Sequence, residues 1–175
     1  MTILERSLDR LHELDQYFGS RARILMSDAL ILQRELREAD VVIGAVLVPG
    51  AVASHLVTRE MLALMKPHSV IVDVAIDQGG CFETSRPTTH ANPVFEVDGI
   101  LHYCVANMPG AVPVTATRTL TNATLPYVRR LASVGVNAAL AENPGFARGL
   151  NVKDGEITYA LVAEAFAQGP PVAAW

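Results

Sequence analysis

An uninterrupted apolar run of eight residues, from Val41 to Val48, constrains the fold of this chain more than any other feature. Pro49 and Gly50 end the run, and a second run, Ser69–Ile76, follows the same pattern apart from a few polar residues. A strand with one face in water alternates polar and apolar residues, whereas a strand of a helix-covered parallel sheet is apolar throughout. The two runs therefore predict parallel strands that are buried on both faces.

Short apolar runs alternate with longer stretches in which apolar residues recur every three or four positions, as on one face of a helix. In the first of these stretches Leu8, Leu11 and Leu14 form a stripe, and Gly19 is a plausible helix end. Alternating strands and helices joined by short turns indicate an α/β fold with a doubly wound parallel sheet. We expect strands ending at Glu5 and covering 23–26, 41–48, 69–76 and 100–106, and helices near 8–18, 29–38, 58–64, 120–132 and 158–166.

The segment 77–99 has little periodicity and contains Gly79, Gly80, Pro87 and Pro93. It predicts a long ordered loop between two strands. Loops of this length in compact domains commonly carry function.

The composition excludes several classes of protein. Half of the 175 residues are hydrophobic and 18% are charged, which favours a folded domain with a sizeable core. A net charge of −4 and the lack of a basic cluster argue against nucleic-acid binding. No apolar run is long enough to span a membrane, and the first residues do not resemble a signal peptide. We therefore expect a cytoplasmic protein that contacts neither nucleic acid nor membrane.

Ligands of open parallel sheets bind at the carboxyl ends of the strands, and Glu5 ends the first predicted strand. An acid that closes the second strand of a dinucleotide-binding sheet accepts hydrogen bonds from the adenosine ribose hydroxyls. A glutamate here can equally be an exposed residue at the start of a helix, where negative charge is favourable. The local sequence leaves both interpretations open.

Asp77 is a second candidate, because it directly follows a buried strand and precedes Gly79 and Gly80, which let a ligand approach the backbone closely. Its carboxylate could orient a substrate amine or move a proton during oxidation at an adjacent carbon. The alternative is an aspartate that caps the following turn. Asp73, inside the same predicted strand, is expected to be a buried hydrogen-bond partner.

The cysteines and histidines predict no metal site. Cys81 and Cys104 are too few for a disulfide framework and lack zinc-ligand spacing, so we expect buried thiols. None of the five histidines stands at helical or strand spacing from another candidate ligand, and we interpret all five as non-catalytic.

Several segments together resemble one family, the bacterial alanine dehydrogenases. They are Ala45–Gly50, Asp73–Glu83, Ser85–Thr89, Tyr103–Pro109 and Leu120–Thr124. The similarity is collinear over nearly the whole chain, and its most specific parts are the Asp-Gln-Gly-Gly sequence at 77–80 and the Ser-Arg-Pro-Thr-Thr sequence at 85–89. The α subunit of NAD(P) transhydrogenase shares the fold but differs in these loops, and is the more distant alternative.

The resemblance implies NAD as cofactor and the reversible oxidative deamination of L-alanine to pyruvate and ammonia. It implies that Asp77 is the catalytic carboxylate, that Glu5 binds the ribose and that Arg10 lies beside the adenosine. Residues 1–115 would form a partial NAD-binding Rossmann domain, and residues 116–175 a helical segment that packs on a substrate domain. The other residues expected to line NAD, together with Asp77, are Ser27, Val46, Leu47, Val74, Ala75, Ile76, Arg86, Val105, Ala106, Asn107 and Met108.

The chain departs from the family at its start, because only four residues precede Glu5. A G-x-G-x-x-G fingerprint stands about 20 residues before the ribose acid. We therefore expect an incomplete Rossmann-like sheet without its first β-strand and glycine-rich turn, and without the N-terminal substrate-binding half. Since that first strand is central in the order 3-2-1-4-5-6, the two strands that flank it lose a neighbour. They would pair with each other, recruit a strand from a partner or stay partly disordered.

Two functions follow from this departure. The chain is the C-terminal part of an alanine dehydrogenase, inactive until a separate N-terminal half chain joins it, in a family whose intact members form hexamers. Alternatively, it is a non-catalytic truncated product that binds nucleotide weakly or occupies an oligomer interface.

Overall fold

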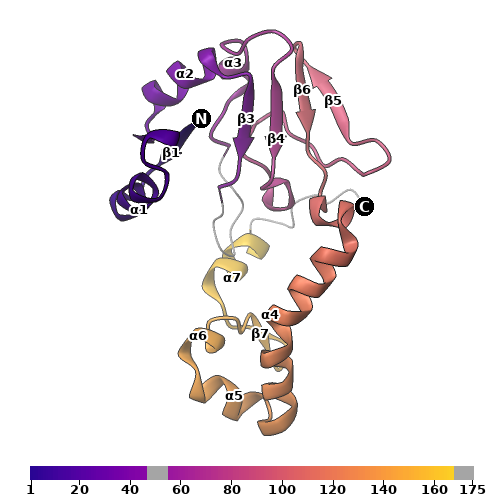
Figure 1. Cartoon of the computed structure of the whole chain (residues 1–175). Coiled ribbons are helices and arrows are strands. Elements are labelled where there is room, and N and C mark those ends of the chain that lie inside the picture. Colours follow the sequence, from indigo (N-terminus) through magenta and orange to yellow (C-terminus); the bar gives the residue numbers. More distant parts are fainter. Residues whose placement is uncertain (47–54, 168–175) are drawn as a thin grey trace. The chain divides into compact units, whose positions relative to one another are not determined.

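The computed structural model describes residues 1–46 and 55–167. The described residues form two compact units, one of residues 1–46 and 55–106 and the other of residues 107–167 (Figure 1). Leu47, one of the expected cofactor-binding residues, and the Pro-Gly pair at 49–50 lie outside the described residues.

The chain begins with a parallel β-α-β-α arrangement: β1 (Thr2–Glu5), α1 (Leu8–Phe18), β2 (Arg23–Met26) and α2 (Ala29–Glu38). Each helix has a side-chain cap, because Ser7 Oγ accepts the Arg10 N–H and Asp28 Oδ1 accepts the Ile31 N–H at 2.8 Å. Gly19 follows α1 with a φ of 49°. These elements confirm the predicted strands and helices of the first 38 residues.

A second sheet has the strand order β3-β4-β6-β5, and Figure 1 shows these four strands side by side. β3, β4 and β6 are parallel, whereas β5 runs antiparallel to β6. The sheet and its short helix comprise β3 (Val41–Gly44), α3 (Arg59–Leu62), β4 (Val70–Asp73), β5 (Val94–Val97) and β6 (Ile100–Tyr103).

The core lies on one face of this second sheet. Ile71 of β4 is fully buried there against Leu36 of α2 and Leu62 of α3, and Val42 of β3 packs against the same cluster. Phe82 covers the same core from the segment after β4. The mainly parallel sheet with helices on this face confirms an α/β fold.

The first unit contains two separate sheets rather than one. In the described part of the chain β1 pairs only with β2, and β3 pairs only with β4, so β1 and β3 are not joined to each other. Val41 and Ile43 of β3 are 54% and 65% exposed, so the prediction that this strand is buried on both faces is wrong. A run that is apolar throughout is typical of a strand covered on both faces. Here no described helix of the first unit covers the face that carries Val41 and Ile43.

The segment 77–99, predicted as a long ordered loop, contains β5 and the turn that joins it to β6. β5 and β6 are joined by Asp98 and Gly99, whose φ values are 52° and 79°. Positive φ at both turn residues is typical of the two-residue hairpin turns that favour Asp-Gly. The loop prediction is therefore wrong for 94–97. The predicted strands are also too long at their carboxyl ends, because β3 ends at Gly44, β4 at Asp73 and β6 at Tyr103.

The second unit is mainly helical: α4 (Pro113–Val134), α5 (Val136–Glu142), α6 (Pro144–Ala147), β7 (Val152–Lys153), β8 (Glu156–Ile157) and α7 (Ala160–Ala167). α4 begins seven residues before the predicted helix start at 120, because Pro113 suits the first position of a helix. α5, α6 and the β7–β8 hairpin were not predicted. Among the described residues, no helix is long and apolar enough to cross a membrane.

Candidate functional site

Glu5 and Ser27 meet at the carboxyl ends of β1 and β2. The Ser27 N–H donates to the Glu5 carbonyl at 2.8 Å, and Glu5 Oε1 accepts the N–H groups of Ser7 and Arg6 at 3.0 and 2.6 Å. These backbone hydrogen bonds lower the pKa of Glu5. The carboxylate is thus held at the strand end beside the start of α1, which accords with both interpretations of Glu5.

Arg10 lies on the first turn of α1, and its guanidinium forms an ion pair with Glu13 on the same helix. The positive charge of Arg10 also contributes to lowering the pKa of Glu5. Glu5, Ser27 and Arg10 therefore form one group of predicted residues around the ends of β1 and β2.

Asp77 is carried by a tight turn after β4. The turn begins with the 3-10 helix η2 (Ile76–Gln78), and the N–H groups of Gln78 and Gly80 both donate to the Ala75 carbonyl, at 2.9 and 3.1 Å. Gly79 and Gly80 have φ values of 100° and 86°, which favour glycine. Asp77 is exposed and, within the described residues, its carboxylate accepts no hydrogen bond, so it does not cap the turn.

Asp73 lies beneath this turn and is fully buried. Its Oδ1 accepts the Ala75 N–H at 3.2 Å, and its Oδ2 accepts the Cys81 N–H at 2.9 Å. The prediction that Asp73 is a buried hydrogen-bond partner is confirmed.

The strand ends near Asp77 also expose apolar side chains. Val74 and Val46 are 49% and 38% exposed, and the Val74 N–H donates to the Gly44 carbonyl at 2.8 Å, which ties the ends of β3 and β4 together. Ile76 and Val105, by contrast, are buried. Their side chains belong to the core, so these two residues could meet a ligand only through their backbone.

Arg86 stacks on Phe95 of β5, with its guanidinium carbon 4.2 Å from the ring centroid. The Phe95 ring in turn stacks on His102 of β6 at a centroid distance of 4.9 Å. Arg86 is therefore held over the hairpin by a cation–π contact.

His102 is a fully buried residue that the sequence interpretation treated only as non-catalytic. Its Nδ1 lies 2.9 Å from the Ile100 carbonyl and its Nε2 lies 2.8 Å from Thr84 Oγ1. Because the carbonyl can only accept, Nδ1 carries the proton and Nε2 accepts from the threonine. Burial lowers the pKa of His102 and favours this neutral form. The Asp-Gly turn signal between two apolar runs could have revealed the hairpin that positions it.

Asn107 and Met108 belong to the second unit, in the segment that leads into α4. Met108 begins a 3-10 helix, η3 (Met108–Ala111), and the Asn107 carbonyl accepts the Gly110 N–H at 2.9 Å. Ala106, the last residue of the first unit, is exposed.

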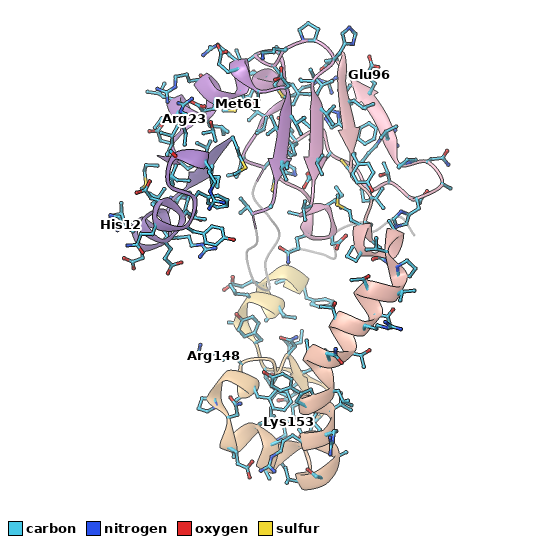
Figure 2. All side chains as sticks on the ribbon, viewed as in Figure 1. His12, Arg23, Met61, Glu96, Arg148 and Lys153 are labelled. Atoms are coloured by element: carbon cyan, nitrogen blue, oxygen red, sulfur yellow. The ribbon has the colours of Figure 1, made fainter. Side chains whose placement is uncertain are left out.

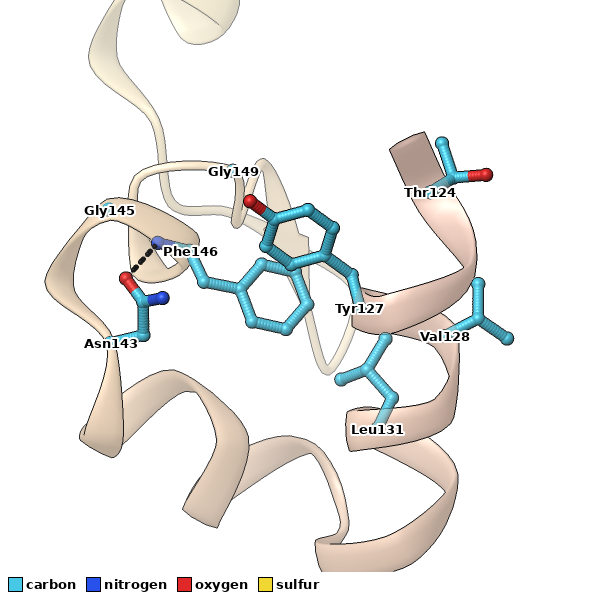
Figure 3. Close-up of a pocket in the computed structure, with 8 residues that line it drawn as sticks. All are labelled: Thr124, Tyr127, Val128, Leu131, Asn143, Gly145, Phe146 and Gly149. Carbon is cyan, nitrogen blue, oxygen red and sulfur yellow. Dashed lines mark hydrogen bonds between the residues drawn. The ribbon is translucent and has the colours of Figure 1, made fainter. Parts of the chain in front are cut away.

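The second unit has an apolar hollow that contains none of the predicted site residues (Figure 3). Tyr127 of α4 and Phe146 of α6 face each other across it with ring centroids 5.0 Å apart, and Leu131 lies beside them. Asn143 Oδ1 accepts the Phe146 N–H at 3.0 Å and so fixes the start of α6.

The residues at the strand ends suit a dinucleotide. Glu5 offers a fixed carboxylate for hydroxyl groups, while Val46 and Val74 offer apolar surface for a planar ring. Next to Asp77, the buried Oε1 of Gln78 has no hydrogen-bond partner within the described residues. An acceptor left in this state is costly, and a ligand amide or hydroxyl could satisfy it.

Comparison with known proteins identifies the family of this chain. Residues 1–160 match the family described as "Alanine dehydrogenase/PNT, C-terminal domain". An alanine dehydrogenase of Halomonas elongata is 60% identical over 166 residues, which cover 95% of this chain and 45% of that protein. One of Mycolicibacterium smegmatis is 51% identical over 164 residues, covering 94% of this chain and 44% of that protein.

Solved structures give the same result. One described as L-alanine dehydrogenase matches with a TM-score of 0.81 at 46% identity, covering 96% of this chain and 46% of that chain. A transhydrogenase of Sinorhizobium meliloti matches with a TM-score of 0.68 at 23% identity, covering 91% of this chain and 42% of that chain, and so shares the fold. The chain spans about 45% of the length of the curated relatives it matches. The resemblance noted from the sequence is confirmed, and the chain belongs to the alanine dehydrogenase/PNT C-terminal domain family.

Proposed function

We propose that this chain is the NAD-binding portion of an alanine dehydrogenase, which converts L-alanine reversibly to pyruvate and ammonia. The observation that carries the proposal is the exposed Asp77 on its glycine-rich turn, at the carboxyl end of β4, the middle one of three adjacent parallel strands. Family membership supports the reaction, since the most similar relatives reported above are named alanine dehydrogenases.

In this proposal each end of the site has its own task. Glu5 accepts hydrogen bonds from the ribose hydroxyls, with Arg10 beside the adenosine. Val46 and Val74 keep water from the nicotinamide ring. The further residues that line NAD, several through their backbone, are Ser27, Leu47, Ala75, Ile76, Asp77, Arg86, Val105, Ala106, Asn107 and Met108.

NAD, when bound, accepts the hydride that leaves Cα of alanine. The substrate amine must lose a proton as its carbon is oxidised, and Asp77 is the carboxylate that would orient this amine and receive the proton. Asp77 is suited to this task because no described residue occupies its oxygens. Binding of the substrate carboxylate is assigned to a portion of the enzyme outside this chain.

We also propose that the enzyme needs a complementary N-terminal portion. The first unit has two separate sheets, and β3 exposes Val41 and Ile43 on a face without a described cover in that unit. An unpaired strand edge presents a row of backbone N–H and C=O groups that can pair with another strand, so a further strand between β1 and β3 would join the sheets and pair both edges. Residues 116–175 would then pack on the substrate-binding portion, and the whole would form a cytoplasmic homo-oligomer.

A two-component assay tests this function. The chain would be purified and mixed, or co-expressed, with the N-terminal portion of the Halomonas elongata relative that it does not match. We expect NADH formation that depends on alanine only when both pieces are present. Activity of the chain by itself would refute the need for a partner. A tightly associated pair without activity would favour the non-catalytic alternative, in which the chain binds nucleotide or forms an interface.

A further inference from the structure

We propose that Asp73 is a positioning residue that holds the turn carrying Asp77 in its working shape. The inference rests on the proposed function, because it gives Asp77 the catalytic role. Its own basis is a buried carboxylate that binds the backbone at both ends of that turn.

The two oxygens of Asp73 have separate partners. Oδ1 accepts the Ala75 N–H at the start of the turn, and Oδ2 accepts the Cys81 N–H at its end. One side chain thus fixes the two points between which Asp77 is suspended. Because Asp73 is the last residue of β4, its two hydrogen bonds attach the turn directly to the sheet.

Gly80 shows how closely the turn follows this carboxylate. A Cβ atom added to Gly80 would lie 2.6 Å from Asp73 Oδ2, which is closer than real Cβ atoms approach. The chain can pass over Asp73 only where a side chain is lacking. The positive φ of Gly80 also favours glycine at this position. The close approach to Asp73 and the backbone conformation therefore both require a residue without a side chain.

The end of the turn is also held from the other side. The Cys81 carbonyl accepts the N–H groups of Leu56 and Val57 at 2.8 and 3.2 Å, while its N–H goes to Asp73. Cys81 is therefore a fixed end point, and Ala75 is the other. A turn anchored in this way presents Asp77 without ordering cost when substrate binds.

The chemistry calls for a carboxylate at position 73. A carboxylate accepts hydrogen bonds at both oxygens, whereas the amide of asparagine accepts at one and donates at the other. In Asp73→Asn an NH₂ group would face one of the two backbone N–H groups. That N–H would lose its acceptor, and one end of the turn would be released while side-chain volume stays nearly constant.

The test uses two samples, the 175-residue chain and a chimera. In the chimera the chain replaces the matching segment of the full-length Halomonas elongata alanine dehydrogenase, to which it is 60% identical. In the chimera, Asp73→Asn should lower kcat on the order of 100-fold, since small misplacements of a reacting group cost this much. The KM for NAD should rise much less than kcat falls, because the proposed contacts of Glu5 and Val46 with NAD lie outside the turn.

The matched control is Ser69→Ala. Ser69 is buried just before β4, and its Oγ has no partner within the described residues, so its loss should leave both constants unchanged. In the chain, hydrogen exchange of the amides at 75–81 should become about tenfold faster or more in Asp73→Asn, the loss expected for a hydrogen bond to a charged group. Exchange in β1 and β2 should not change.

Each outcome decides the proposal. An unchanged kcat in an active chimera would overturn it, as would an equal loss in Ser69→Ala or faster exchange throughout the first unit. A chimera without activity before any substitution would count against the proposed function instead. The exchange experiment then decides whether Asp73 holds the turn, and unchanged exchange at 75–81 would overturn the inference.

Discussion

Gly44 and Phe82 are so close that a Cβ atom added to Gly44 would lie 2.6 Å from Cε2 of the phenylalanine ring. It would also lie 2.7 Å from Cβ of Cys81. The end of β3 therefore lies directly beneath the segment that follows the Asp77 turn, and a glycine is required for this contact.

Gly44→Ala is predicted to destabilise the chain by about 1–3 kcal/mol, because an added methyl group in a packed interior forces its neighbours apart. The free energy of unfolding from urea titration measures this effect. Val41→Ala in the same strand is the control, since the Val41 side chain is more than half exposed and its loss should cost less. Equal stability of Gly44→Ala and the unsubstituted chain would mean that the contact is not closely packed.

His102 predicts a pH dependence of stability. Burial lowers its pKa below the ordinary value near 6.5, so the folded state binds a proton less readily than the unfolded state. The stability due to neutral His102 is complete above the ordinary pKa and is lost as the pH falls through the lowered value. We expect the free energy of unfolding to decrease as the pH falls below the ordinary pKa of histidine.

The variant His102→Gln should make this decrease smaller, whatever its effect on absolute stability. His12→Gln is the control, because His12 lies exposed on α1 (Figure 2). If both variants retain the full decrease, the pH dependence has another source.

The two cysteines should resist thiol reagents in the folded chain. Burial raises the pKa of Cys81 and of Cys104, and the negative charge of Asp73 adds to both shifts. Since the thiolate is the reactive form, labelling by a maleimide at about pH 8 should proceed only on unfolding. A Ser20→Cys variant, with its thiol on the exposed turn after α1, should label at once. Rapid labelling of all thiols under native conditions would contradict the buried placement.

Glu5 should determine the choice between NAD and NADP. A fixed carboxylate at the end of β1 accepts hydrogen bonds from ribose hydroxyls and repels a 2′-phosphate. In the chimera, Glu5→Gln should raise the KM for NAD on the order of tenfold, as for the loss of a hydrogen bond to a charged group. The ratio of kcat/KM for NAD to that for NADP should fall at the same time. Equal use of both cofactors before substitution would show that Glu5 does not contact the ribose.

Part of the fold could be predicted because local signals and tertiary structure agree there. The stripe of Leu8, Leu11 and Leu14 predicted α1, and Gly19 predicted its end. The exposure of Val41 and Ile43 could not be predicted from the sequence. Their apolar side chains indicate a strand that is covered on both faces, and the described residues provide no cover for this face.

Most of the candidate site residues were predicted from the resemblance to a family, and few from local sequence patterns. The position of Asp77 after a buried strand identified it as a candidate, but the open state of its carboxylate depends on the turn that Asp73 and the two glycines create. Those hydrogen bonds join Asp73 to residues two and eight positions further along the chain and leave no periodic signal. Arg86 was expected at the cofactor, and its stacking on Phe95 required β5, which lies in the segment predicted as a loop.

The catalytic role of Asp77 is tested by its replacement with asparagine in the chimera, with alanine-dependent NADH formation and NAD binding as the two measurements. Asparagine retains the size of the side chain but cannot take up the amine proton. We expect kcat to fall on the order of 100-fold or more, in the range of a lost general base, while the affinity for NAD is kept. Turnover equal to that of the unsubstituted chimera would contradict this role.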